Sequence, residues 1–112
     1  MEQVFNKLVR DKIPDKIKSN GEVAVTRVLD DDEYRKELFK KLLEEANEVI
    51  NSSSKEESIE ELADVLEVIK SIGELNNFSL ENIIDAANKK RLSRGGFKKR
   101  MFLESTRRKN EE

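Results

Sequence analysis

Four carboxylates recur at helical spacing in the middle of the chain and form a candidate site for a divalent cation. Glu45 and Glu48 are three residues apart, and Glu61 and Asp64 repeat that interval after twelve intervening residues. Residues three apart lie on the same side of an α-helix. Four carboxylates held close together repel one another strongly unless a counter-charge is present, and a divalent cation supplies one.

Two apolar stripes define the helices that have to position these acids. One stripe consists of Leu38, Leu42, Glu45 and Val49, at spacings of four, three and four. The other consists of Glu61, Val65, Val68 and Ile72. Each stripe therefore carries one carboxylate, with a second one turn further on. We predict helices over about residues 32–50 and 55–75, and antiparallel packing through the stripes would bring the four acids together.

Ordinary helix chemistry offers another explanation for these acids. Ser58 has the capping-box spacing to Glu61, although Ser54 follows the loop residues directly and is the better helix start. Glu45 can also pair with Lys41, one turn earlier. Acidic pairs are common on charged helices, so spacing alone leaves the metal site and the structural explanation both open.

The composition narrows the choice of metal. The chain has no histidine and no cysteine, which removes the usual zinc ligand sets, His-based nucleophilic triads and disulfides. A metal must be held mainly by oxygen, which favours magnesium, manganese or calcium. Of the 112 residues, 41% are charged and 36% hydrophobic, which indicates one domain of long exposed helices with a thin core.

The sequence gives weaker evidence on cellular location and on binding partners. The net charge of -2 singles out no partner. We expect a cytoplasmic protein, because cysteine is absent and neither a signal peptide pattern nor an apolar run of about 20 residues is present. A thin helical core leaves apolar surface to cover, so we also expect a homo-oligomer, most simply a dimer.

The elements around the central helices are shorter. Residues 11–14 mark a helix start with Pro14 in the first turn, and Asn20 and Gly21 end that helix. Residues 23–29 alternate apolar and polar side chains and are rich in β-branched types, which predicts a strand. Residues 97–103 are the candidate second strand that would pair with it.

The C-terminal part is predicted to begin with a helix. Ser79 caps this helix, which runs through Leu92, and Gly95 with Gly96 stops it. The predicted domain covers residues 1–105, and residues 106–112 form a polar tail.

Charge is unevenly distributed along the chain. Residues 30–67 contain 14 acidic and 5 basic side chains, whereas residues 89–109 contain 10 basic and 1 acidic. Lys90 and Arg94 share a helix face and could bind phosphate groups, or could simply complement the helix dipole. Gly95 and Gly96 would let backbone amides approach a phosphate. A nucleic-acid interface on this basic segment is the less favoured alternative, because it leaves the acids unexplained.

In order along the chain, the acids read Glu44-Glu45-x-x-Glu48 and then Glu61-x-x-Asp64. This arrangement resembles the EExxE…ExxD signature of the MazG-like all-α nucleotide pyrophosphohydrolases, which include phosphoribosyl-ATP pyrophosphohydrolase and the dimeric dUTPases. Residues 7–14 (KLVRDKIP) and 94–97 (RGGF) resemble a compact single-domain branch labelled phosphoribosyl-ATP pyrophosphohydrolase-like. The resemblance spans roughly residues 6–97.

The resemblance implies a mainly α fold, an all-α NTP pyrophosphatase-like helical bundle, here with a small two-stranded β element. It implies a nucleotide substrate, attack of water on the α-phosphorus and release of pyrophosphate. The implied ligands of Mg²⁺, with Mn²⁺ as a possible substitute, are Glu45, Glu48, Glu61 and Asp64. Such chemistry needs metal, positioned water and positive charge rather than Cys or His.

We assign Glu48 to orienting or deprotonating the water, and Lys90 and Arg94 to the departing pyrophosphate. The predicted substrate-binding residues are Lys7, Arg10, Lys12, Lys90, Arg94, Gly95 and Gly96. For the first three, a role in ordering the N-terminus is an equal alternative. The sequence does not decide between phosphoribosyl-ATP and another nucleoside triphosphate. A non-enzymatic helical partner-binding module, with acids that no longer bind metal, is the competing hypothesis.

Overall fold

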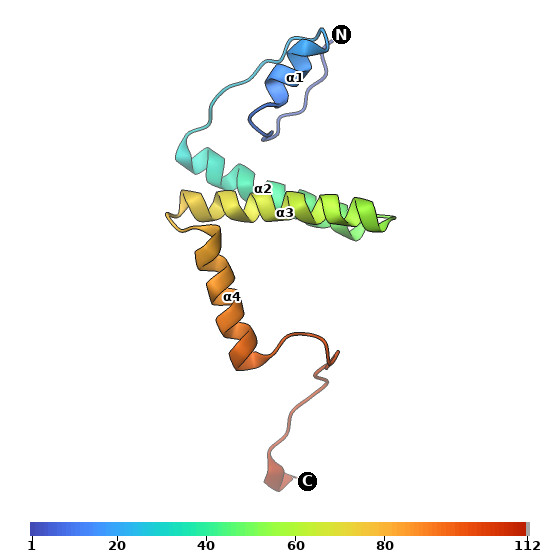
Figure 1. Ribbon diagram of the computed structural model, residues 1–112, viewed down its shortest axis with the longest axis vertical. Coiled ribbons are helices and arrows are strands. Elements are labelled where there is room, and N and C mark those ends of the chain that lie inside the picture. Colours follow the sequence, from blue (N-terminus) through green and yellow to red (C-terminus); the bar gives the residue numbers. More distant parts are fainter. Residues whose placement is uncertain (112) are drawn as a thin grey trace. The chain divides into compact units, whose positions relative to one another are not determined.

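The computed structural model describes residues 1–111, and its regular structure is helical (Figure 1). In chain order the elements are α1 (Ile13–Ser19), α2 (Asp31–Ile50), α3 (Lys55–Leu75), α4 (Leu80–Arg94) and the short 3-10 helix η1 (Lys109–Glu111). The chain divides into two compact units, Met1–Leu80 and the part from Glu81 onward, and each is described by itself. In the described part of the chain, no helix has both the length and the apolar character needed to span a membrane.

Side-chain caps start the two central helices within one residue of the predicted starts. Asp30 accepts a hydrogen bond from the Glu33 backbone N–H at 2.9 Å, which satisfies one of the free donors at the start of α2. Ser54 does the same for α3, accepting from the Glu57 N–H at 3.1 Å. Ser54 rather than Ser58 is therefore the cap of α3, so Glu61 is not the partner of a capping serine.

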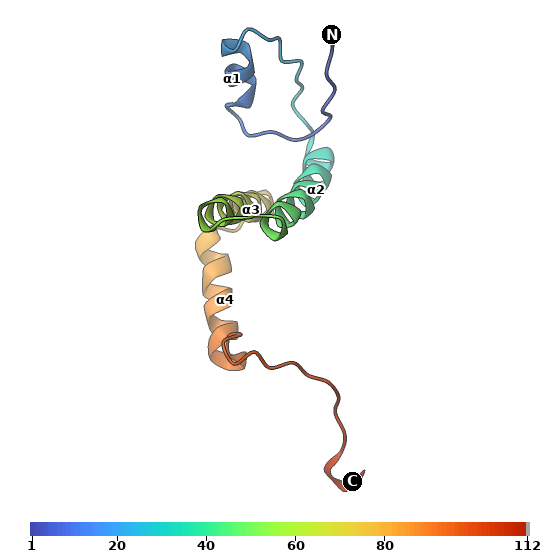
Figure 2. The same ribbon diagram turned by 90° about the vertical axis from the view of Figure 1, so that its right-hand side faces the viewer.

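The α2–α3 hairpin is the centre of the first unit. Residues 51–54 connect the two helices, and both views show them packed side by side (Figure 1 and Figure 2). The core is where the two predicted stripes meet, and Leu38 and Val68 are its buried side chains, at 3% and 7% exposure. The other stripe residues are partly buried, so the predicted helices and their contact faces are confirmed.

A second apolar stripe runs along the hairpin and stays exposed. We call it the outer stripe, and its side chains are between 48 and 77% exposed. It consists of Phe39, Leu43, Ile50, Ile59, Leu62 and Leu66. Six large apolar side chains on one helix pair are more than scattered surface residues, and such a surface usually marks an interface.

The predicted two-stranded β element is wrong, because no strand occurs among residues 1–111. Val23, Val25 and Val28 are 89 to 98% exposed, so the alternating pattern of residues 23–29 has no packed face beneath it. A strand needs a partner for its backbone groups. The intended partner, residues 97–103, instead contains a turn in which the Arg100 N–H donates to the Phe97 carbonyl at 3.0 Å.

The remaining helices begin and end close to the predicted residues. Pro14 lies in the first turn of α1, and Gly21 follows that helix with φ of +85°. The helix α4 begins directly after Ser79 and extends two residues beyond the predicted end at Leu92. Gly95 ends it with φ of +83°, the left-handed conformation that glycine adopts without penalty. Of the predicted polar tail, Glu112 lies outside the described residues.

Candidate metal centre

Three of the four predicted metal ligands meet between the central helices. Glu45 comes from α2, and Glu61 and Asp64 come from α3. Each offers a carboxylate oxygen, and these oxygens all lie within 4.8 Å of one another. Antiparallel packing of the stripes accounts for this, because each stripe carries one of the acids into the helix contact.

Glu48 lies at the edge of this carboxylate cluster rather than inside it. Its side chain is exposed, and it is not one of the three groups whose oxygens converge. The charge of Glu48 nevertheless acts on the cluster. Burial is the largest cause of the raised pKa of Glu61, and the Glu48 charge is the next largest. The role of Glu48 in orienting or deprotonating a water stays a prediction.

Electrostatic strain marks the cluster. Partial burial, followed by the Asp64 charge, raises the pKa of Glu45, while Lys41 opposes the shift. Burial also raises the pKa of Glu61, and the charges of Glu48, Asp64 and Glu45 add to the effect. The side chains around these two carboxyls thus supply less positive charge than would balance them, which is the condition that a divalent cation relieves.

Basic side chains provide part of the missing counter-charge. The Arg10 guanidinium Nη2 donates to Asp64 Oδ1 at 2.6 Å, and Lys7 Nζ lies 3.9 Å from Glu44 Oε1. Lys41 Nζ lies 3.6 Å from Glu44 and 3.7 Å from Glu45. The ordinary i,i+4 pairing of Lys41 and Glu45 is therefore present together with the convergence of the three acids.

Lys41 is a site residue that the sequence-based prediction of ligands and binding residues omits. Its spacing to Glu45 points to an ion pair, and that signal is indistinguishable from the many surface pairs of charged helices. Only the packing of α2 on α3 shows that the pair borders a cluster of acids.

A pocket of about 530 Å³ opens beside the acids within the first unit. Glu45 and Asp64 line it, and the predicted substrate residues Arg10 and Lys12 lie in its wall. Its apolar wall includes Leu8, Val9, Leu38 and Val68. The volume is in the range of small-molecule sites, and charged side chains of both signs make up more than half of the residues in the wall.

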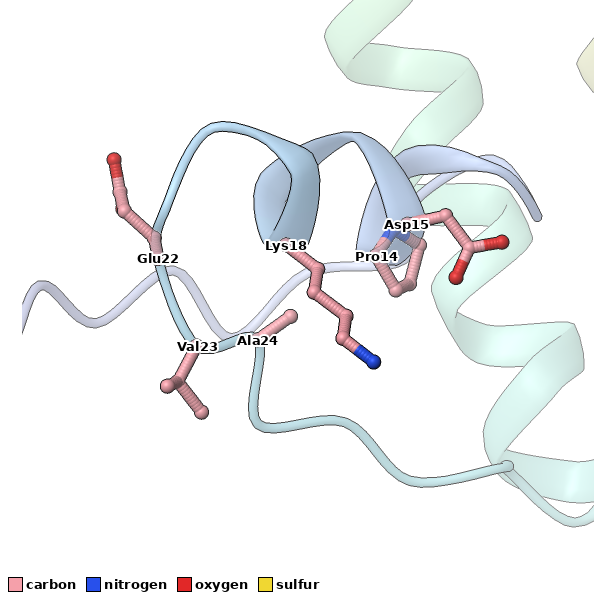
Figure 3. Close-up of a pocket in the computed structure, with 6 residues that line it drawn as sticks. All are labelled: Pro14, Asp15, Lys18, Glu22, Val23 and Ala24. Atoms are coloured by element: carbon pink, nitrogen blue, oxygen red, sulfur yellow. The ribbon is translucent and has the colours of Figure 1, made fainter.

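A second hollow, of about 290 Å³, lies between α1 and the segment that follows it (Figure 3). Its walls are Pro14, Asp15, Lys18, Glu22, Val23 and Ala24. None of the converging carboxylates lines it, so it offers no comparable set of metal ligands.

The predicted phosphate residues of the basic segment belong to the second unit. Lys90 and Arg94 are exposed one turn apart on α4. Gly95 donates its N–H to the Arg91 carbonyl at 2.8 Å. A Cβ at Gly96 would lie 3.3 Å from the guanidinium carbon of Arg91, so that side chain rests against the glycine. The cooperation of these groups with the carboxylates stays a prediction.

Comparison with known proteins assigns the chain to a family. The family model described as phosphoribosyl-ATP pyrophosphohydrolase matches residues 5–91. The chain belongs to this family. The family is part of the MazG-like all-α pyrophosphohydrolase superfamily, so the resemblance seen in the sequence motifs is confirmed.

A curated relative covers a smaller part of the chain. It is a protein of Mycolicibacterium smegmatis named only as uncharacterized, and it is 42% identical over 53 residues. The match covers 47% of this chain and 54% of the relative, so the chain spans about half the length of the curated relative it matches. No solved structure matches.

The phosphoribosyl-ATP pyrophosphohydrolase family is named for the hydrolysis of a nucleotide. The matched residues 5–91 include the carboxylate cluster, Glu48, the basic residues of segment 7–12 and Lys90. They stop before Arg94 and the two glycines. The family match therefore covers nearly all of the first unit, and the second unit only as far as residue 91.

Proposed function

We propose that this protein hydrolyses the α–β phosphate bond of a nucleoside triphosphate or of phosphoribosyl-ATP, with Mg²⁺ or Mn²⁺ as the metal. The observation that carries the proposal is the convergence of Glu45, Glu61 and Asp64 within 4.8 Å. Two of these groups, Glu45 and Asp64, border a pocket with basic residues in its wall, in a chain whose family is named for this reaction.

The donor set fits a hard divalent cation. It is made entirely of carboxylate oxygens, which Mg²⁺ and Mn²⁺ prefer over soft ligands. Burial raises the pKa of Glu45 and of Glu61, and the charge of Asp64 adds to both shifts. Glu45, Glu61 and Asp64 would hold the ion, with Glu48 beside them. A bound divalent ion would polarise the phosphate oxygens and neutralise negative charge on the reacting phosphates.

Side chains of the protein would transfer the proton and neutralise the phosphates. Glu48 accepts the proton of the attacking water, whose oxygen forms the new bond to the α-phosphorus. The bond from that phosphorus to the bridging oxygen breaks, and pyrophosphate leaves with the bond's electron pair. Arg10 and Lys12 neutralise the phosphates from the wall of the pocket, and Lys90 and Arg94 are proposed to assist from the basic segment.

We also propose that a second copy of the chain covers the outer stripe. Its six apolar side chains expose about half or more of their surface, and burying such side chains gains about 25 cal/mol per Å². In an isologous dimer the same stripe lies on both sides of a two-fold axis, so the apolar side chains of one copy would pack against those of the other.

Pyrophosphate release tests the reaction directly. Purified protein is assayed with the common ribo- and deoxyribonucleoside triphosphates and with phosphoribosyl-ATP, with Mg²⁺ and with EDTA. We expect metal-dependent release of pyrophosphate and monophosphate, and a loss of about 10²- to 10⁴-fold for Glu48→Gln if it is the general base. Glu60→Gln, an exposed acid on α3 outside the cluster, is the matched control.

The products separate the competing functions. Release of orthophosphate instead of pyrophosphate would refute cleavage at the α–β bond. No turnover of any substrate by a folded protein, whose melting temperature also ignores Mg²⁺, would leave the acids structural and favour the non-enzymatic binding module.

A further inference from the structure

The N-terminal segment crosses both helices of the metal site. Lys7 reaches Glu44 on α2, and three residues later Arg10 reaches Asp64 on α3. Between them Leu8 and Val9 are half-buried and line the pocket. The segment is therefore held over the site by an ion pair to each helix and by two apolar side chains.

Arg10 is hydrogen-bonded to a carboxylate, that of Asp64, which the metal would need as a ligand. Its guanidinium donates to Asp64 Oδ1 at 2.6 Å, and Asp64 is one of the three converging carboxylates. Neither partner is deeply buried, since the side chains of Arg10 and Asp64 are 57% and 39% exposed. Water can therefore replace the bond at small cost, as it does for exposed ion pairs.

Arginine is suited to exchange this partner for another. A guanidinium binds a carboxylate or a phosphate with the same planar fork of N–H donors. Arg10 also lines the pocket proposed to hold the nucleotide. When a divalent cation takes Asp64, the released guanidinium remains next to the place where substrate phosphates would lie.

We propose that Arg10 is an exchangeable internal counter-ion that couples metal binding to phosphate binding. Without metal it neutralises Asp64. With metal it gives up Asp64 and binds a phosphate of the substrate. The proposal rests on the proposed function for the presence of a metal and a nucleotide, and adds an order to their binding. Because coupling is reciprocal, phosphate binding to Arg10 also strengthens metal binding.

The first test measures metal affinity rather than activity, by calorimetric titration of the full chain with Mg²⁺ alone. Arg10→Ala removes the internal competitor, so we expect Mg²⁺ to bind about two- to fivefold more tightly. Arg10→Lys keeps the charge and should stay near the unaltered protein. The control is Arg27→Ala, which removes a similar ion pair, to Glu33 at 2.7 Å, away from the carboxylate cluster.

The second test needs no variant. Amide hydrogen exchange at Ile13, whose N–H donates to the Arg10 carbonyl at 3.0 Å in the unaltered protein, should accelerate with Mg²⁺ alone, because the bond from Arg10 to Asp64 is lost. It should slow again when inorganic pyrophosphate is added to the Mg²⁺-saturated protein. Pyrophosphate binding at saturating Mg²⁺ should weaken about ten- to hundredfold in Arg10→Ala, the range for a hydrogen bond to a charged group.

Two results would overturn the proposal. One is unchanged or weaker Mg²⁺ binding by Arg10→Ala, and the other is hydrogen exchange at Ile13 that does not respond to Mg²⁺. If nucleotide cleavage is metal-dependent in the same preparation, only the role of Arg10 fails. If the unaltered protein neither binds Mg²⁺ nor cleaves a nucleotide, the proposed function fails as well.

Discussion

Removing one acid from the carboxylate cluster should stabilise the metal-free protein. Glu45 is the most informative position, because its side chain is only 13% exposed and its pKa is raised by burial and by the Asp64 charge. A raised pKa means that the folded state disfavours the charged form. Glu45→Gln keeps the shape of the side chain and removes that charge.

The magnitude follows from the distances. Two unit charges 4.8 Å apart repel by about 0.9 kcal/mol with water-like screening. Partial burial adds to this cost, and loss of the Lys41 ion pair at 3.7 Å subtracts from the gain. We expect Glu45→Gln to raise the free energy of unfolding by about 0.5 to 1 kcal/mol. In a domain of this size that raises Tm by roughly 2 to 6 °C.

Thermal unfolding followed by circular dichroism, in EDTA at neutral pH, measures this change. Glu37→Gln is the matched control on the same helix, because Glu37 pairs with Lys40 at 3.0 Å and stands outside the cluster. With Mg²⁺ the order should reverse, since the unaltered protein gains stability from the ion and Glu45→Gln loses a ligand. A Glu45→Gln protein that is less stable than the unaltered one in EDTA would refute the electrostatic argument.

The pH dependence has a definite sign. Because the pKa values of Glu45 and Glu61 are raised in the folded state, that state binds more protons than the unfolded chain between about pH 4.3, the ordinary glutamate pKa, and the raised values. The stability from their protonation is fully present below that pH and is lost as the pH rises through the raised values. The advantage of Glu45→Gln over the unaltered protein should therefore shrink as the pH falls through the raised pKa of Glu45, measured as the difference in Tm.

Three further predictions concern the caps, the outer stripe and the basic segment. Ser54→Ala should cost about 1 kcal/mol of stability in urea unfolding through loss of the α3 cap, whereas Ser58→Ala should cost much less; equal losses would contradict the assignment of the cap. Leu62→Lys should convert a dimer into a monomer in analytical ultracentrifugation, and a monomeric unaltered protein at micromolar concentration would rule out the proposed assembly. Arg94→Ala should lower kcat/KM for pyrophosphate release about ten- to hundredfold if the guanidinium binds phosphate, with Lys98→Ala near the unaltered rate; identical behaviour of the two variants would remove Arg94 from the site.

Local signals explain why the helices could be predicted from the sequence. An α-helix is made of contacts three and four residues apart, so its apolar stripe is written directly into the chain. Asp30 and Ser54 act on backbone groups within three residues, which is equally local. The candidate ligands Glu45, Glu61 and Asp64 could be chosen because each stands in or beside such a stripe.

The strand prediction failed because the decisive contact is not local. Alternation in residues 23–29 describes which side chains share a face, but a strand also needs a partner for its backbone and a layer against its apolar side. Val23 and Val25 have no such cover in the described structure. The role of Arg10 was hidden for the same reason, since its partner Asp64 lies 54 positions away.

By itself the sequence determined the helices α1 to α4, the faces through which α2 and α3 pack, and the carboxylates that could bind a metal, because all of these depend on spacing within a few residues. Only the tertiary structure decided that Glu45, Glu61 and Asp64 converge while Glu48 lies at their edge, and that Arg10 neutralises Asp64. It also left the outer stripe exposed. These outcomes depend on how distant segments pack and share charge, and no local pattern records that.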